Sequence, residues 1–90
     1  MIKTNTEDNI TYFCENKWGE KSYAKLANKL AEESGEVCGA VVKIEENRCT
    51  FLDLEKEIGD VLIVLSQFAS KMNLTLEEIR RRRFLDIQNR

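Results

Sequence analysis

The sequence has no histidine and no proline, and only four glycines and three cysteines among its 90 residues. Without histidine, Ser-His-Asp and Cys-His catalysis are excluded. The cysteines are odd in number and widely spaced, and no C-x-x-C pair occurs, so a zinc finger is excluded as well. Any enzyme built from this chain must therefore work through carboxylates, amines, guanidiniums or a metal ion.

The chain also lacks a large excess of charge and a long apolar run. Its net charge is -2, with 33% charged and 42% hydrophobic residues, which argues against a basic nucleic-acid binder and an acidic disordered tail. No apolar stretch is long enough to span a bilayer, and the polar, acidic start is not a secretory signal. We therefore expect a single cytoplasmic domain over residues 1–90, with no membrane partner and with Cys14, Cys38 and Cys49 as reduced thiols.

Apolar residues recur with helical periodicity along the whole chain, which predicts an all-α fold of four helices. Capping signals mark the helix starts: Thr4 with Glu7, Ser22, Thr50 with Asp53, and Thr75 with Glu78. The first three helices should end near Gly19, Ile44 and Met72. Asn73 suits the left-handed conformation that commonly ends a helix. No cap precedes Arg90, so the natural chain can extend beyond it.

The third predicted helix is apolar on every side over residues 61–65, V-L-I-V-L. A helix that is apolar all round must be covered all round. Three other short helices offer too little surface to do this. We therefore expect a homo-oligomer whose interface uses the third helix, and the sequence leaves open whether it is a dimer or a tetramer.

Two pairs of carboxylates carry most of the functional information. Glu33 and Glu36 belong to E-S-G-E, and Glu57 and Asp60 belong to E-I-G-D. The i, i+3 spacing places each pair on one face of a helix. Helical angles put Glu33 inside the apolar stripe of the second helix and Glu36 at its edge. If the second and third helices pack antiparallel through their stripes, the four acids meet at one rim of the seam.

Four acids beside a core are costly unless something neutralises them. Mg²⁺ prefers hard oxygen ligands, and ions held by several carboxylates can clamp a phosphate and activate a water for in-line attack. The alternative interpretation is that the acids are solvated and paired with lysines such as Lys29 or Lys56. The presence of two pairs beside apolar stripes of consecutive helices favours the metal site.

The segment K-L-A-E-E-S-G-E-V (29–37), followed after a gap by L-E-K-E-I-G-D-V-L (54–62), resembles the MazG-like all-α nucleoside triphosphate pyrophosphohydrolases. That superfamily is marked by E-x-x-E, a variable gap and E-x-x-D. The gap here holds 20 residues, within the usual range, and the resemblance extends from about Trp18 to the basic last helix.

The resemblance implies Mg²⁺-dependent hydrolysis of a (deoxy)nucleoside triphosphate to monophosphate and pyrophosphate, with Mn²⁺ as a possible substitute. It implies a role in removing non-standard or surplus nucleotides. It also implies helical hairpins that assemble as dimers or tetramers. As metal ligands and catalytic residues it implies Glu33, Glu36, Glu57 and Asp60.

The resemblance extends to residues outside the two motifs. Glu32 is a candidate catalytic residue that orients a water or a ligand, and a solvated helix acid is the alternative. Lys29 is a candidate for binding a phosphate, and a surface lysine is the alternative. Trp18 is a candidate for stacking on a base, against a core or interface tryptophan. Arg83 and Arg90 are candidates for phosphate contacts, although four consecutive arginines make their alignment ambiguous.

Other functions remain open at this point. A helical interaction or regulatory module without catalysis would use the same oligomer-forming helix. A nucleic-acid binder would use the run from Arg80 to Arg83, but this is weak support in a slightly acidic protein, so nucleic acid is not the expected partner. Phosphoribosyl-ATP hydrolysis is an alternative within the same superfamily. The base and sugar of the substrate are not encoded in any motif.

Overall fold

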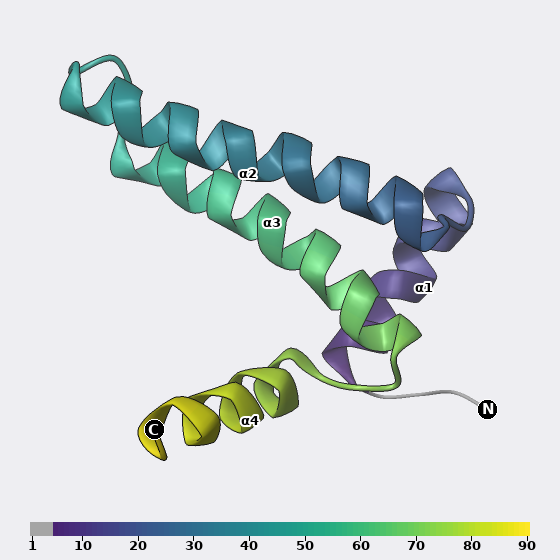
Figure 1. The fold of residues 1–90 in the computed structure, drawn as a ribbon. Coiled ribbons are helices and arrows are strands. Elements are labelled where there is room, and N and C mark those ends of the chain that lie inside the picture. The colour runs from purple at the N-terminus through teal and green to yellow at the C-terminus, as the bar shows by residue number, and fades with distance from the viewer. Residues whose placement is uncertain (1–4) are drawn as a thin grey trace. The chain divides into compact units, whose positions relative to one another are not determined.

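A computed structural model of the chain describes residues 5–90, which form four helices and no strand (Figure 1). The helices are α1 (Thr6–Trp18), α2 (Tyr23–Glu45), α3 (Phe51–Lys71) and α4 (Leu76–Gln88). The predicted all-α, four-helix fold is therefore confirmed. None of the helices in this range is long and apolar enough to cross a membrane.

The predicted N-caps of α2 and α4 are confirmed. The hydroxyl of Ser22 accepts a hydrogen bond of 3.2 Å from the backbone N–H of Lys25. Thr75 and Glu78 form a complete capping box, in which each side chain accepts from the other residue's backbone N–H at 3.1 Å. These bonds satisfy donors that the first helical turn leaves without a partner.

The ends of α1 and α3 depend on residues that tolerate the left-handed region. Gly19 ends α1 with a φ of 86°, and Asn73 follows α3 with a φ of 58°, as predicted. Thr4, the predicted cap of α1, lies outside the described residues. Asn5 caps this helix, because its side chain accepts a 2.8 Å hydrogen bond from the backbone N–H of Asp8.

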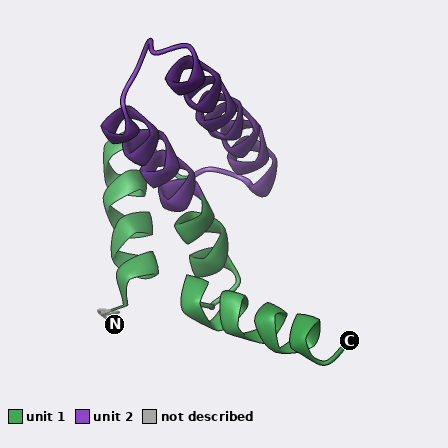
Figure 2. Cartoon of the chain, turned by 90° about the vertical axis from the view of Figure 1, so that its left-hand side faces the viewer, with its two compact units in different colours: residues 1–20, 65–90 green, residues 21–64 purple. Residues whose placement is uncertain are grey.

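The chain divides into two compact units (Figure 2). One unit holds residues 1–20 and 65–90, with α1, the last part of α3, and α4. In this unit the Ser70 hydroxyl donates a 2.5 Å hydrogen bond to Asp8, and Cys14 and Ala69 are buried. The other unit holds residues 21–64. The single domain over residues 1–90 stays a prediction.

In the unit of residues 21–64, α2 and the first part of α3 run antiparallel as a helical hairpin (Figure 1). Asn47 takes a φ of 59° in the connection, which asparagine tolerates better than most residues. The Cys49 thiol donates a 3.3 Å hydrogen bond to the Ala40 carbonyl, which ties the connection to α2. This hairpin has the geometry that brings acids on α2 and α3 to one level.

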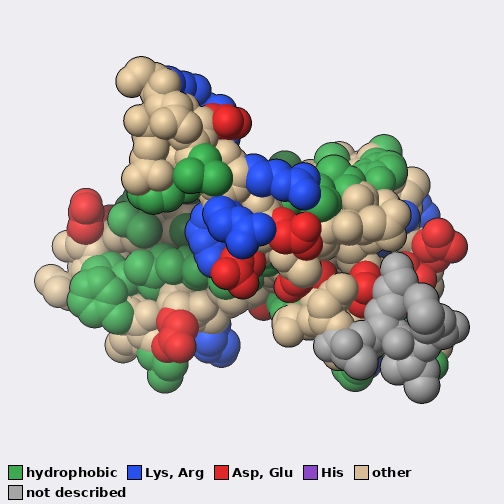
Figure 3. All heavy atoms as spheres, turned by 90° about the horizontal axis from the view of Figure 1, so that it is seen from below, with side chains coloured by type: hydrophobic (Ala, Val, Ile, Leu, Met, Phe, Trp, Pro, Cys, Tyr) green, Lys and Arg blue, Asp and Glu red, His purple; other side chains and the backbone are tan. Residues whose placement is uncertain are grey.

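Many large apolar side chains stay on the surface, where they lie between acidic and basic ones (Figure 3). Within the hairpin unit the large exposed hydrophobic side chains are those of Tyr23, Val41, Val42, Phe51, Leu52, Ile58, Leu62 and Ile63. In α4 no residue is buried.

The start of α3 is fixed by a reciprocal pair of hydrogen bonds between Thr50 and Asp53. The backbone N–H of Asp53 donates to the Thr50 hydroxyl at 3.3 Å, and the backbone N–H of Thr50 donates to the Asp53 carboxylate at 2.8 Å. The bond from the Thr50 backbone, followed by that from its hydroxyl, lowers the pKa of Asp53. A carboxylate kept ionised at a helix N-terminus also interacts favourably with the helix dipole.

We expect Thr50→Ala to lower the free energy of unfolding by about 1 kcal/mol, because it removes the N-cap of α3. Urea unfolding followed by circular dichroism would measure the change. Thr50→Ser keeps the hydroxyl and is the matched control. If the serine variant loses as much stability as the alanine variant, the hydroxyl is not what holds this helix start.

Candidate metal centre

The hairpin brings the two predicted acid pairs together. Glu33 and Glu36 come from α2, and Glu57 and Asp60 come from α3. One carboxylate oxygen from each lies within 4.8 Å of those of the other three. The i, i+3 spacing sets each pair on one face, and the antiparallel course of the helices sets the two faces opposite each other.

Glu33 is the buried member of this cluster, with only 6% of its surface exposed. Leu26, two turns earlier on the same face of α2, is 1% exposed, so Glu33 does lie within the buried stripe. One Glu33 carboxylate oxygen, Oε1, is 3.1 Å from the Lys29 ammonium nitrogen. The other, Oε2, is buried without a hydrogen-bond partner, and so is Oε2 of Glu57. Burying an unpartnered polar oxygen is unfavourable, typically by about 1–3 kcal/mol.

The carboxylates of the cluster repel one another. The pKa of Glu36 is raised, first because the protonated Glu36 shares a hydrogen bond with Glu57, and next because of the charge of Glu33. The pKa of Lys29 is also raised, mainly because its ammonium donates a hydrogen bond to Glu33. Glu36 therefore retains its proton more readily than an isolated glutamate does, as is expected for an acid that lies beside other acids without enough positive charge.

The residues present fit a divalent cation. The donor set consists of carboxylates, which are the ligands that Mg²⁺ prefers. The unpartnered oxygens of Glu33 and Glu57 are buried donors that a cation would satisfy. The alternative of simple ion pairs accounts for only part of the cluster. Among residues 5–90, Lys29 is the lysine that pairs with it, whereas Lys56 forms no ion pair there.

The other predicted site residues have different surroundings. The exposed Glu32 carboxylate lies 3.8 Å from the Lys29 ammonium. Trp18 and Arg83 belong to the unit of residues 1–20 and 65–90. Trp18 is 62% exposed and packs edge-to-face on Phe13, with ring centroids 6.2 Å apart, and Arg83 is exposed on α4. The roles assigned to Glu32, Trp18 and Arg83, and the phosphate contact assigned to Lys29, stay predictions.

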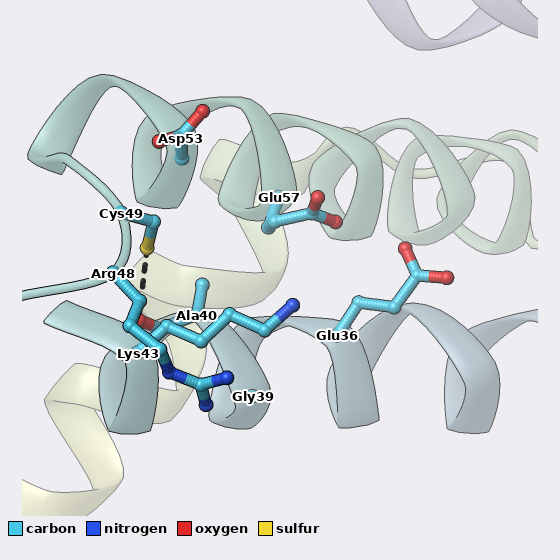
Figure 4. Close-up of a pocket in the computed structure, with 8 residues that line it drawn as sticks. All are labelled: Glu36, Gly39, Ala40, Lys43, Arg48, Cys49, Asp53 and Glu57. Atoms are coloured by element: carbon cyan, nitrogen blue, oxygen red, sulfur yellow. Dashed lines mark hydrogen bonds between the residues drawn. The ribbon is translucent and has the colours of Figure 1, made fainter. Parts of the chain in front are cut away.

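A pocket of about 630 Å³ opens beside the acid cluster (Figure 4). It is lined by Glu36, Gly39, Ala40, Lys43, Arg48, Cys49, Asp53 and Glu57. Sequence reasoning did not single out Lys43 and Arg48. Lys43 follows Glu36 by seven residues, two helical turns, so helical spacing could have placed it on the same face. Arg48 lies in the connection, whose path no periodicity encodes.

Glu36→Gln tests the repulsion within the cluster. Folding raises the pKa of Glu36 above its value in the unfolded chain. The protonated Glu36 therefore stabilises the fold fully at pH values below the unfolded-state pKa, and this stabilisation is lost as the pH rises through the folded-state pKa. Glutamine cannot ionise. With a chelator present, we therefore expect the variant to melt above wild type at about pH 7 and together with it at about pH 3.5.

Adding Mg²⁺ at about pH 7 should make wild type melt above Glu36→Gln, because wild type gains more stability from a bound ion than a variant with one ligand fewer. Differential scanning fluorimetry would follow both effects. Equal melting temperatures at both pH values would contradict the account of the cluster.

Comparison with known proteins agrees with this geometry. Residues 21–90 match the MazG nucleotide pyrophosphohydrolase domain family. The matched segment contains both acid pairs and the whole hairpin that joins them. No significant match to a curated protein or to a solved structure is found. Because the match covers most of the sequence, this chain belongs to the MazG nucleotide pyrophosphohydrolase family.

Proposed function

We propose that this nucleotide pyrophosphohydrolase domain hydrolyses a (deoxy)nucleoside triphosphate between the α- and β-phosphates, releasing a monophosphate and pyrophosphate. The proposed cofactor is Mg²⁺, and the proposed role is removal of non-standard or surplus nucleotides in the cytoplasm. The observation that carries the proposal is the convergence of four carboxylates within 4.8 Å, with buried oxygens that lack partners.

The four acids Glu33, Glu36, Glu57 and Asp60 would hold the metal. A bound divalent ion supplies neutralising charge for a phosphate and makes water a better nucleophile at neutral pH. Lys29 has a positioning role in this proposal. Its ammonium holds one oxygen of Glu33, which leaves the other oxygen for the ion.

The cluster has a closed side and an open side. Glu33 is buried, whereas Glu36 and Asp60 are exposed and Glu57 is half-buried. Glu36 and Glu57 also line the neighbouring pocket. A phosphate would therefore approach from the pocket side. Glu32, exposed beside Lys29, remains the proposed residue for orienting a water or a ligand.

We also propose that the protein is a homo-oligomer, a dimer or a tetramer. The apolar run over residues 61–65 leaves Leu62 47% and Ile63 40% exposed in the single chain, next to the exposed Ile58. Contiguous exposed apolar surface of this kind commonly marks an interface. Trp18 for the base and Arg83 for the phosphates remain the proposed substrate contacts outside the hairpin.

We expect wild type to release pyrophosphate from at least one member of a panel of NTPs and dNTPs, and only with Mg²⁺ or Mn²⁺ present. Glu33→Gln and Glu57→Gln should each lower kcat/KM by more than the roughly 10–100-fold that loss of an outer-shell partner costs. The helical circular dichroism signal should stay unchanged.

Glu55→Gln is the matched control, because Glu55 is an exposed acid of α3 outside the cluster. It should retain full activity. Wild-type rates in both Glu33→Gln and Glu57→Gln would exclude the cluster as the reaction centre.

We expect wild type to sediment as a dimer or tetramer, and Leu62→Glu to shift it toward monomer, because a charge in an apolar interface is left without a partner. Analytical ultracentrifugation over a range of protein concentrations would show this. Glu55→Gln again serves as the control. A wild-type protein that stays monomeric at all concentrations would refute the oligomer.

A further inference from the structure

We propose that Lys43 and Arg48 form an anion subsite that binds the phosphates of the substrate lying beyond the metal cluster, on the side away from the base. The proposal rests on the proposed function, because it takes the substrate to be a nucleoside polyphosphate. In this proposal, the residues near the connection between α2 and α3 determine how long a phosphate chain the protein binds.

The first argument is continuity between the pocket and the acid cluster. Glu36 and Glu57 belong to both, so a phosphate held at the cluster has the pocket directly beside it. At the other end of the same pocket lie Lys43 and Arg48 (Figure 4). One ligand with several negative groups can therefore contact both ends.

Lys43 is suited to reach back along the pocket. Helical side chains lean toward the N-terminus of their helix, which is the direction of Glu36. Figure 4 shows the Lys43 side chain extended over Gly39 toward Glu36 and Glu57. Gly39 leaves this space open, since a Cβ added there would meet nothing within 4 Å. Lys43 forms no ion pair with any residue from 5 to 90.

Arg48 is the second cation of the pocket, and its present ion-pair partner can be exchanged for a phosphate. Its guanidinium donates hydrogen bonds of 2.6 and 3.1 Å to one oxygen of Glu46. Both side chains are more than half exposed, and ion pairs of that kind contribute little stability. A phosphate offers the guanidinium two oxygens in matching geometry, which favours exchange of the partner.

The composition of the lining favours phosphates over a base. Its uncharged members are Gly39, Ala40 and Cys49, and none of the eight lining residues is aromatic. Nucleobases are commonly held by stacking on aromatic side chains or arginine, together with hydrogen bonds to their edges. A pocket of small and charged residues instead fits a chain of phosphates.

The charges of the pocket make binding depend on the metal. Three acids, Glu36, Asp53 and Glu57, face two cations, Lys43 and Arg48. Asp53 is also engaged by Thr50, whose hydrogen bonds keep it ionised. The charges of the lining residues therefore do not favour an anion by themselves. Cations bound at the acid cluster would reverse the balance, so phosphate binding and metal binding are coupled.

Inorganic tripolyphosphate, measured by isothermal titration calorimetry, is the probe for this subsite. With Mg²⁺ present we expect wild type to bind it, and Lys43→Gln and Arg48→Gln to weaken binding about tenfold to hundredfold each, as expected for a lost charged hydrogen bond. The same variants should lower kcat/KM for a hydrolysed triphosphate by a similar factor and change monophosphate binding little.

Two controls separate this role from a structural one. Lys25→Gln removes an exposed lysine of α2 that does not line the pocket, and Glu46→Gln removes the partner of Arg48. Lys25→Gln should bind tripolyphosphate like wild type, and Glu46→Gln should bind it at least as tightly, because Arg48 then has no carboxylate partner to give up. Gly39→Leu should fold at least as well, because leucine is the better helix former, and should bind tripolyphosphate poorly because the pocket is filled.

The outcomes distinguish the inference from the function on which it rests. If Lys43→Gln and Arg48→Gln bind tripolyphosphate as Lys25→Gln does, the subsite is refuted, even where wild type hydrolyses triphosphates. If wild type releases no pyrophosphate from any nucleotide, the proposed function fails. Selective loss of Mg²⁺-dependent tripolyphosphate binding in the two variants would then still establish the anion subsite.

Discussion

Mutual repulsion among the carboxylates of Glu33, Glu36, Glu57 and Asp60 is the constraint on which the rest of the site depends. The hairpin holds their oxygens within 4.8 Å, although like charges this close disfavour each other's ionisation. The pKa of Glu36 is raised, first by the hydrogen bond with Glu57 and next by the charge of Glu33, and one oxygen each of Glu33 and Glu57 is buried without a hydrogen-bond partner. A fold that keeps such a cluster gives up stability unless a cation joins it, so we interpret the cluster as a binding site.

Along one groove of the hairpin, negatively charged side chains are followed by positively charged ones. Acids gather where α2 and α3 face each other, and the cations Lys43 and Arg48 follow toward the connection. A nucleoside polyphosphate with its metal ions has the complementary order, with positive charge at the acids and negative oxygens beyond them. The caps that fix the start of α3 therefore also shape the pocket, because Thr50 orients Asp53 at its rim.

Local physics explains what the sequence predicts well. N-caps at Ser22 and Thr75 depend on hydrogen bonds between residues three apart, so their positions can be read from residue type. The i, i+3 spacing similarly shows that Glu33 and Glu36 share a face. The position of Arg48 depends instead on the path of the connection between α2 and α3, in which Asn47 has a positive φ. This path brings Arg48 close to the residues of α2 that line the pocket. Such contacts have no periodic signal.

The central claim is that the acid cluster binds a divalent ion. Titrating Mn²⁺ into wild type and Glu33→Gln, with free Mn²⁺ followed by electron paramagnetic resonance, tests it without any assumption about the substrate. Our account predicts saturable loss of the free-ion signal with wild type and a much weaker loss with the variant. A wild-type protein that leaves all added Mn²⁺ free, or a variant that binds it equally well, would contradict the account.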